Sequence, residues 1–104
     1  MLILAKNFIE NIENLDENTA LEFLAMANNR ISSLSGLEKL VNVIDFWFDG
    51  NNVSDWNEVV KLRCMTKLQT VFFKQNPIYK DSSYRTKMKV ALPNLIEIDA
   101  TPWY

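Results

Sequence analysis

A repeat of 22 residues constrains the fold of this chain more than any other feature. Asn7, Asn29 and Asn51 are spaced 22 residues apart, and Asn76 continues the series after three extra residues. Apolar residues recur at equivalent positions around these asparagines, in the sets Leu4, Met26, Phe48; Ile9, Ile31, Val53; and Leu15, Leu37, Val59. One such unit cannot bury its apolar residues alone, so the spacing predicts a stack of similar coils.

The repeat reads L-x-x-L-x-L-x-x-N-x-I-x-x-L-x-x-L-x-x-L, which is the pattern of a leucine-rich repeat. The segments LEFLAM and IDFWF are expected to be short parallel strands, each followed by a turn that carries the asparagine. A buried amide there would satisfy backbone groups of the turn and of the next coil. NRISSLSGLEKL and NNVSDWNEVVKL are expected to return as helical or 3₁₀ arms. The predicted fold class is α/β, a leucine-rich-repeat solenoid with short parallel strands on its concave face.

The repeat pattern ends at Ile78, and the residues after it differ in character. We expect residues 1–78 to form about four coils, the first incomplete, and residues 79–104 to form a helical C-terminal cap. No capping element precedes Leu2, so the N-terminal end of the stack would expose core and a strand edge. The chain is therefore expected to be a piece of a longer array, or to pair with something at that end.

The C-terminal cap is predicted to contain one helix and one closing strand. Asp81 or Ser82 would cap the helix, and Pro93 would end it. Leu95 and Ile98 would supply the closing strand that covers the last repeat. The apolar face of the helix would consist of Tyr84, Met88, Ala91 and Leu92.

The repeat register sorts the strand residues into inward and outward rows, because neighbouring strands lie about 4.8 Å apart and side chains alternate between the two faces. Phe46 and Phe48 are expected inside. One outward row holds Ile3, Ala25, Trp47, Phe72 and Asp99. The next outward row holds Phe23, Asp45, Thr70 and Glu97.

An aromatic cluster bordered by acids is therefore expected on the concave face. Large aromatic anchors flanked by charges are typical of protein-binding hot spots, and acids favour a basic partner. The alternative is that the aromatic side chains merely cover one another. The candidate partner-binding residues are Asp45, Trp47, Phe72, Phe23 and Asp49.

Several chemistries find little support in the composition. The chain has no histidine and only two glycines, which removes His-dependent nucleophile systems and glycine-rich phosphate loops. The Cα atoms of Asp45 and Asp49 should lie about 13 Å apart, too far for a carboxylate dyad. Cys64 stands alone, which favours a reducing compartment. We expect no catalytic residue, metal, cofactor or small-molecule substrate, and no membrane span.

The two parts of the chain differ in charge. Residues 1–60 carry ten acidic and three basic residues, a net charge of −7, and residues 61–104 carry three acidic and eight basic residues, a net charge of +5. The acidic part does not suit nucleic acid. The basic residues of the cap, among them Lys87 and Lys89, allow either a solvated helix or an RNA-binding patch. Nucleic acid is therefore not the expected partner.

The segments DFWFDGNNVSDW, LQTVFFKQNPIYKD and EIDAT resemble the C-terminal end of the leucine-rich-repeat regulatory subunit of type-1 serine/threonine protein phosphatase (the protein phosphatase 1 regulatory subunit 7 family). The resemblance implies a non-enzymatic scaffold whose concave face binds the phosphatase catalytic subunit. It implies contacts by Asp45, Trp47 and Phe72, whereas Phe23 and Asp49 are added from the predicted geometry.

The same resemblance implies a nuclear location, with the cytoplasm as a second compartment. The cap pattern NP…YR…LPNL…ID is also similar to that of the spliceosomal A-prime protein. A nuclear ribonucleoprotein interaction module is therefore the alternative function. The terminal TPWY departs from the phosphatase-subunit pattern, so Trp103 and Tyr104 receive no role.

Overall fold

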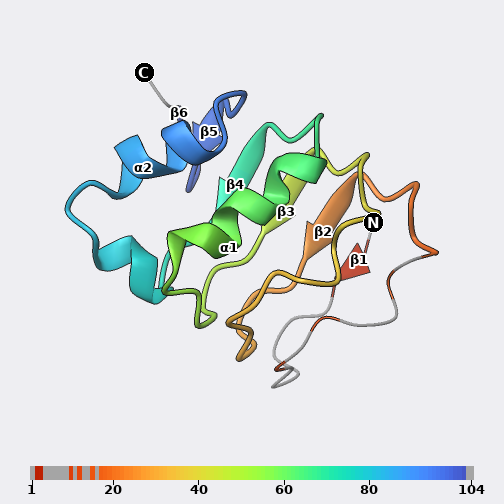
Figure 1. Cartoon of the computed structure of the whole chain (residues 1–104), viewed down its shortest axis with the longest axis horizontal. Coiled ribbons are helices and arrows are strands. Elements are labelled where there is room, and N and C mark those ends of the chain that lie inside the picture. Colours follow the sequence, from red (N-terminus) through yellow and green to blue (C-terminus); the bar gives the residue numbers. More distant parts are fainter. Residues whose placement is uncertain (1, 4–9, 11, 13–14, 16, 103–104) are drawn as a thin grey trace.

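The computed structural model describes residues 2–3, 10, 12, 15 and 17–102. In this part of the chain the strands form a six-stranded sheet in sequence order (Figure 1). The first five strands run parallel, and the last pairs antiparallel with its neighbour. The strands are β1 (Leu2–Ile3), β2 (Phe23–Ala25), β3 (Asp45–Trp47), β4 (Thr70–Phe72), β5 (Glu97–Ile98) and β6 (Thr101–Pro102). This architecture confirms the α/β leucine-rich-repeat solenoid.

The strand register follows the 22-residue repeat. Leu24 pairs with Phe46, Phe46 with Val71, and Val71 with Ile98, so equivalent apolar positions stack across the sheet. Each of these four side chains is fully buried. The strands are shorter than the predicted segments, although backbone hydrogen bonds between coils continue beyond them, as from the Met26 N–H to the Trp47 carbonyl at 2.9 Å. Leu4, Asn7 and Ile9, which begin the predicted series, lie outside the described residues.

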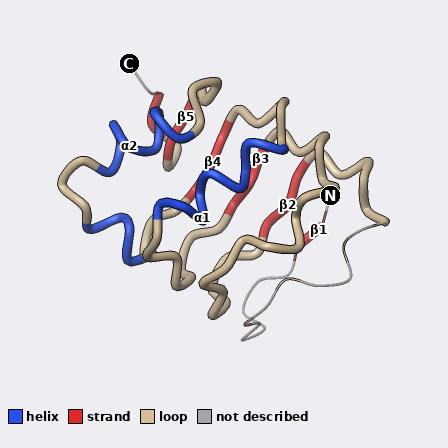
Figure 2. Tube along the Cα trace, in the orientation of Figure 1, coloured by secondary structure: helices blue, strands red, loops and turns tan. Residues whose placement is uncertain are grey.

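The helical segments lie along one face of the sheet and at its C-terminal end (Figures 1 and 2). The loops of the return arms lie on the same face as the first helix. The helical segments are α1 (Trp56–Val60), the 3₁₀ helices η1 (Lys61–Cys64) and η2 (Pro77–Lys80), and α2 (Tyr84–Ala91). None of the described helices is long and apolar enough to cross a membrane. The core lies between the sheet and these arms, where Phe46, Phe48 and Phe73 are fully buried and in mutual ring contact.

The two return arms differ from one another. The arm NNVSDWNEVVKL contains α1, as expected, but residues 30–40 form turns without a helix, contrary to our prediction. Gly36 explains part of this difference because its φ is +104°, and a Cβ there would approach the carbonyl oxygen of Ile12 to 2.5 Å. The first arm thus lies tightly against the preceding coil in a backbone conformation that a helix excludes.

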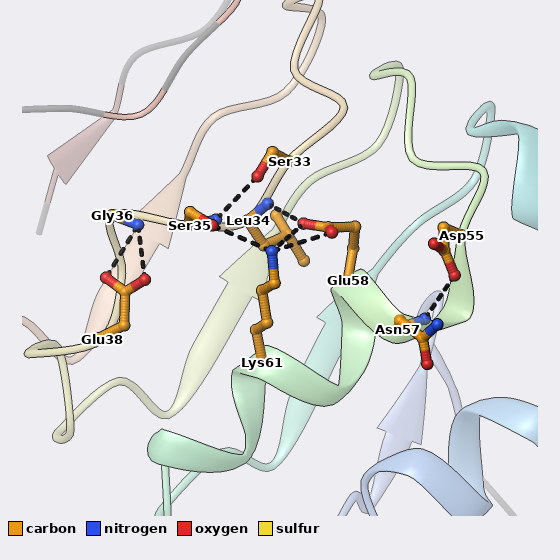
Figure 3. Close-up of polar contacts among 9 residues, drawn as sticks. All are labelled: Ser33, Leu34, Ser35, Gly36, Glu38, Asp55, Asn57, Glu58 and Lys61. Atoms are coloured by element: carbon orange, nitrogen blue, oxygen red, sulfur yellow. Dashed lines mark hydrogen bonds and ion pairs between the residues drawn. The ribbon is translucent and has the colours of Figure 1, made fainter.

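Charged side chains connect the two arms (Figure 3). Glu58 accepts a hydrogen bond of 2.8 Å from the backbone N–H of Leu34, and it pairs with Lys61. Lys61 also donates to the hydroxyl of Ser35 at 3.0 Å. The hydrogen bond from Lys61 and the Leu34 N–H lower the pKa of Glu58. The carboxylate therefore stays ionised and holds one coil against the next.

The repeat asparagines within the described residues, Asn29, Asn51 and Asn76, are buried and hydrogen-bonded to the backbone. The amide nitrogen of Asn51 donates to the carbonyls of Met26 at 2.9 Å and Phe48 at 3.1 Å, and its oxygen accepts from the N–H of Ile31 at 3.1 Å. Asn76 makes the equivalent set one coil later. These bonds reach back to the preceding coil, which corrects the expectation that they join the next one.

The cap covers the last coil with α2. Tyr84, Met88 and Ala91 point into the core, and the helix ends before Pro93. The N-cap residue is Ser83 rather than Asp81 or Ser82, although the Asp81 carboxylate accepts a hydrogen bond from the Ser83 N–H. Leu92 and Leu95 are buried and belong to the connection between α2 and β5, so of the two residues predicted for the closing strand only Ile98 lies in it. The placement of a domain boundary at residue 78 stays a prediction.

Candidate functional site

Three aromatic side chains form a continuous strip across the outward face of the sheet. This aromatic row consists of Phe23 on β2, Trp47 on β3 and Phe72 on β4. The ring centroids of Phe23 and Trp47 are 5.0 Å apart, and those of Trp47 and Phe72 are 4.9 Å apart. Tilted and edge-to-face contacts at such distances are favourable. The structure thus brings the three predicted aromatic residues together.

Trp47 is the exposed centre of the aromatic row. Its side chain is 41% exposed, whereas the preceding Phe46 and the following Phe48 are fully buried. Phe23 and Phe72 are half-buried, in part because the indole lies against both rings. Contact among the three rings therefore explains the partial burial of Phe23 and Phe72, but it leaves a large apolar surface exposed on Trp47. Such a surface, surrounded by polar residues, is a typical anchor position.

Asp45 and Asp49 stand before and after Trp47 on the same chain segment, and both are half-buried. Asp45 lies in register with Phe23 on one side and Thr70 on the other. Among the described residues, the ion pairs are Lys61–Glu58 and Lys87–Asp81, so neither Asp45 nor Asp49 has a cationic partner there. The two carboxylates are therefore available to attract a basic surface.

Two members of the predicted outward rows are buried. Ala25 is buried although it lies in register with Trp47, because its small side chain is covered by larger neighbours. Asp99 is only 5% exposed, and its carboxylate accepts hydrogen bonds from the N–H groups of Phe73 and Lys74 at 2.8 and 3.0 Å. The expectation that Asp99 extends the outward row was wrong.

Asp99 accepts backbone N–H groups of another coil as the repeat asparagines do, although its register position is that of Trp47 and Phe72. It lies just after β5 with φ of 53°, in the left-handed region, and it accepts backbone N–H groups of the preceding coil. The hydroxyl of Tyr84 donates to its second oxygen at 2.5 Å. Burial, followed by this hydrogen bond, raises the pKa of Tyr84 well above its usual range. The cap and the last strand are thereby joined.

Other polar groups of the described chain do not assemble into a reactive centre. Within that part, no group of three or more His, Cys, Asp or Glu side chains could hold a metal ion. Burial raises the pKa of Cys64, and its sulfur lies 3.6 Å from the carbonyl oxygen of Leu37. A raised pKa disfavours the thiolate, which is the nucleophilic form of cysteine.

Comparison with known proteins places the chain among leucine-rich-repeat proteins, although no protein-family model matches it. It is 31% identical over 97 residues to leucine-rich repeat-containing protein 23 of Homo sapiens, which covers 92% of this chain and 28% of that protein. It is 39% identical over 71 residues to the protein phosphatase 1 regulatory subunit SDS22 of Schizosaccharomyces pombe, covering 65% of this chain and 21% of that protein. The chain thus spans less than a third of each of these relatives.

A solved structure shows the same fold over nearly the whole chain. A chain in the crystal structure of the Drosophila melanogaster SNF/U2A' complex matches it with a TM-score of 0.83 and 30% sequence identity. The match covers 96% of this chain and 59% of that one. The stacked parallel strands, arms and closing helix are therefore shared with this structure.

Proposed function

Because this chain is a leucine-rich-repeat protein, we propose that it is a scaffold that binds the catalytic subunit of type-1 protein phosphatase through its sheet face. The contact would consist of the aromatic row together with Asp45 and Asp49. The chain's partial likeness to phosphatase 1 regulatory subunits of Schizosaccharomyces pombe and Xenopus tropicalis supports this choice of partner.

The single observation that carries this proposal is the exposed Trp47 between two contacting aromatic rings. The uncovered indole offers apolar surface that a partner can desolvate. The flanking rings restrict its rotation, so little side-chain entropy remains to be lost on binding. Asp45 and Asp49 would orient a basic partner surface over it. The scaffold acts by contact and has no catalytic role in this proposal.

The proposal predicts that Trp47→Ala and Phe72→Ala each weaken binding to the purified phosphatase catalytic subunit by about 1–4 kcal/mol. Affinity would be measured by titrating the phosphatase against the immobilised chain. Val41→Ala is the matched control, because Val41 is also an exposed apolar residue but lies outside the aromatic row. Equal affinity of both aromatic variants and wild type would remove the aromatic row from the interface.

The structural likeness to a chain of the SNF/U2A' complex favours a second candidate, a nuclear ribonucleoprotein interaction module. In this case the sheet face would dock another protein's helix, and RNA would lie near the basic side of α2. Lys87 there pairs with Asp81 at 2.6 Å and Lys89 donates to the Leu95 carbonyl, so both ammonium groups are already engaged.

The two candidate functions differ in which molecule the immobilised chain would retain. A phosphatase scaffold retains the catalytic subunit in the absence of RNA, whereas the ribonucleoprotein module retains RNA in a salt-dependent manner. Both candidates place the protein in the nucleus, which a fluorescent fusion in living cells would report.

A further inference from the structure

A second surface lies on the opposite side of the sheet from the aromatic row. Between α1 and α2 there is a groove with a volume of about 360 Å³. Its lining includes the apolar side chains of Trp56 and Val60 from α1 and of Val90 and Ala91 from α2. Val59 of α1 is buried in the same core cluster as Phe46, whereas Trp47 lies on the other face of β3 and is exposed.

Trp56 and Val60 pack partly against the core and Ala91 is buried in it, but the exposure of Val90 is not explained by the fold. Val90 is 68% exposed, which is more than any other large hydrophobic residue among those described and more than Trp47. Trp56 and Val60 are half-buried. Valine also has a lower helix propensity than many polar residues, so its exposure on α2 contributes nothing to helix stability. Exposed apolar surface around a cavity of this size is typical of a binding site.

Hydrogen bonds hold the walls of the groove in place. The indole N–H of Trp56 donates to the carboxylate of Asp81 at 3.2 Å. The Nε of Arg63 donates to the carbonyl oxygen of Ala91 at 2.7 Å, which joins η1 to the end of α2. The groove is therefore formed in the unbound protein, and a ligand need not order it.

The charges around the groove are mainly positive. Arg63 and Lys87 line it. Lys87 is paired with Asp81 at 2.6 Å, and the Asp81 carboxylate also accepts hydrogen bonds from the Trp56 indole N–H and the Ser83 N–H. Arg63 belongs to neither of the ion pairs between described residues. An approaching peptide would therefore meet apolar surface beside the Arg63 guanidinium. The complementary ligand has apolar side chains on one face and carboxylates beside them.

We propose that the groove between α1 and α2 is a docking site for an acidic amphipathic helix of a partner protein. Leucine-type side chains of that helix would lie against Trp56, Val60 and Val90, and its glutamates would approach Arg63. Two helices that form an apolar groove are a common receptor for such a segment. This inference does not depend on the proposed phosphatase partner, because none of the groove residues belongs to the aromatic row.

The test uses a synthetic helical peptide with a leucine stripe on one face and glutamates elsewhere. Its binding to the full chain would be followed by fluorescence anisotropy of a dye on the peptide. Wild type should bind the peptide saturably, and Val90→Glu should bind it roughly tenfold more weakly, because the new carboxylate removes apolar contact and repels the glutamates. The substitution is at an exposed position, so thermal unfolding should be unchanged.

Two controls separate the groove from unspecific binding. Val41→Glu adds the same charge at another exposed valine that does not line the groove, and it should bind the peptide like wild type. A peptide with lysines in place of the glutamates should not bind. The proposal is overturned if wild type shows no saturable binding, if Val90→Glu retains wild-type affinity, or if the lysine peptide binds equally well.

Discussion

Asn51 illustrates how one residue connects two coils of the stack. Its amide donates to the carbonyls of Met26 and Phe48 and, at 3.5 Å, to that of Asp49, and it accepts one N–H, with partners in its own coil and in the coil before it. An apolar residue at this position would leave three buried backbone groups without partners. An aspartate could accept the N–H but could not donate to the carbonyls. The recurrence of asparagine at this position therefore has a physical reason.

We predict that Asn51→Asp lowers the free energy of unfolding by about 2–4 kcal/mol, because it removes two buried donations and brings a carboxylate next to two carbonyl oxygens. Asn52→Asp is the matched control, since the neighbouring Asn52 is exposed and should tolerate the change. Urea denaturation followed by circular dichroism would measure both variants. Equal stability of the two would show that the amide donations are unimportant.

At the residue scale, the sequence predicts a side chain's direction well where the repeat is regular. Trp47 is outward and Phe46 inward, as alternation requires. The predicted direction of Asp99 is wrong because its φ of 53° takes it out of strand geometry. Its carboxylate instead accepts backbone N–H groups of an earlier coil. Nothing in the neighbouring sequence indicates these contacts, which come from residues 25 and 26 positions earlier.

At the scale of elements, α1 shows how a short helix is started within an arm. The carboxylate of Asp55 accepts a hydrogen bond of 2.9 Å from the N–H of Asn57, and the backbone of Asp55 is extended, as at a typical N-cap. Five residues are too few for a stable isolated helix, so α1 depends on this cap and on burial of Val59.

Asp55→Ala should reduce the free energy of unfolding by about 1 kcal/mol, because the first turn of α1 loses a hydrogen-bond acceptor. Ser54→Ala changes the exposed residue immediately before it and should have little effect. Chemical denaturation of the two variants and wild type would provide the comparison. A stability loss in Ser54→Ala as large as that in Asp55→Ala would argue against the capping role.

On the scale of the whole molecule, Asp99 joins the cap to the last coil, because it accepts hydrogen bonds from the Tyr84 hydroxyl of α2 and from the N–H groups of Phe73 and Lys74. Tyr84 comes from α2 and Asp99 follows β5, and the bond between them is buried. Because the folded protein raises the pKa of Tyr84, the unfolded chain loses this proton first as pH rises. The stabilising contribution is fully present below the ordinary tyrosine pKa of about 10, and it declines above that value.

We therefore expect Tyr84→Phe to cost about 1–2 kcal/mol of unfolding free energy near neutral pH. The difference from wild type should shrink above about pH 10, because only wild type then loses stability through this group. Tyr79→Phe is the control, since Tyr79 is exposed. Urea denaturation at the two pH values would measure the effect. A Tyr84→Phe difference that stays constant with pH would contradict the linkage.

By itself, the sequence determined the stack of coils, the pairing of equivalent positions and the outward direction of Trp47. These properties follow from a spacing that recurs along the chain, and each coil must bury the same positions. Only the tertiary structure decided that Asp99 turns inward, that residues 30–40 lack a helix and that α1 and α2 enclose a groove. These depend on contacts between non-repeating segments, such as Arg63 with the Ala91 carbonyl 28 residues away, which no local periodicity records.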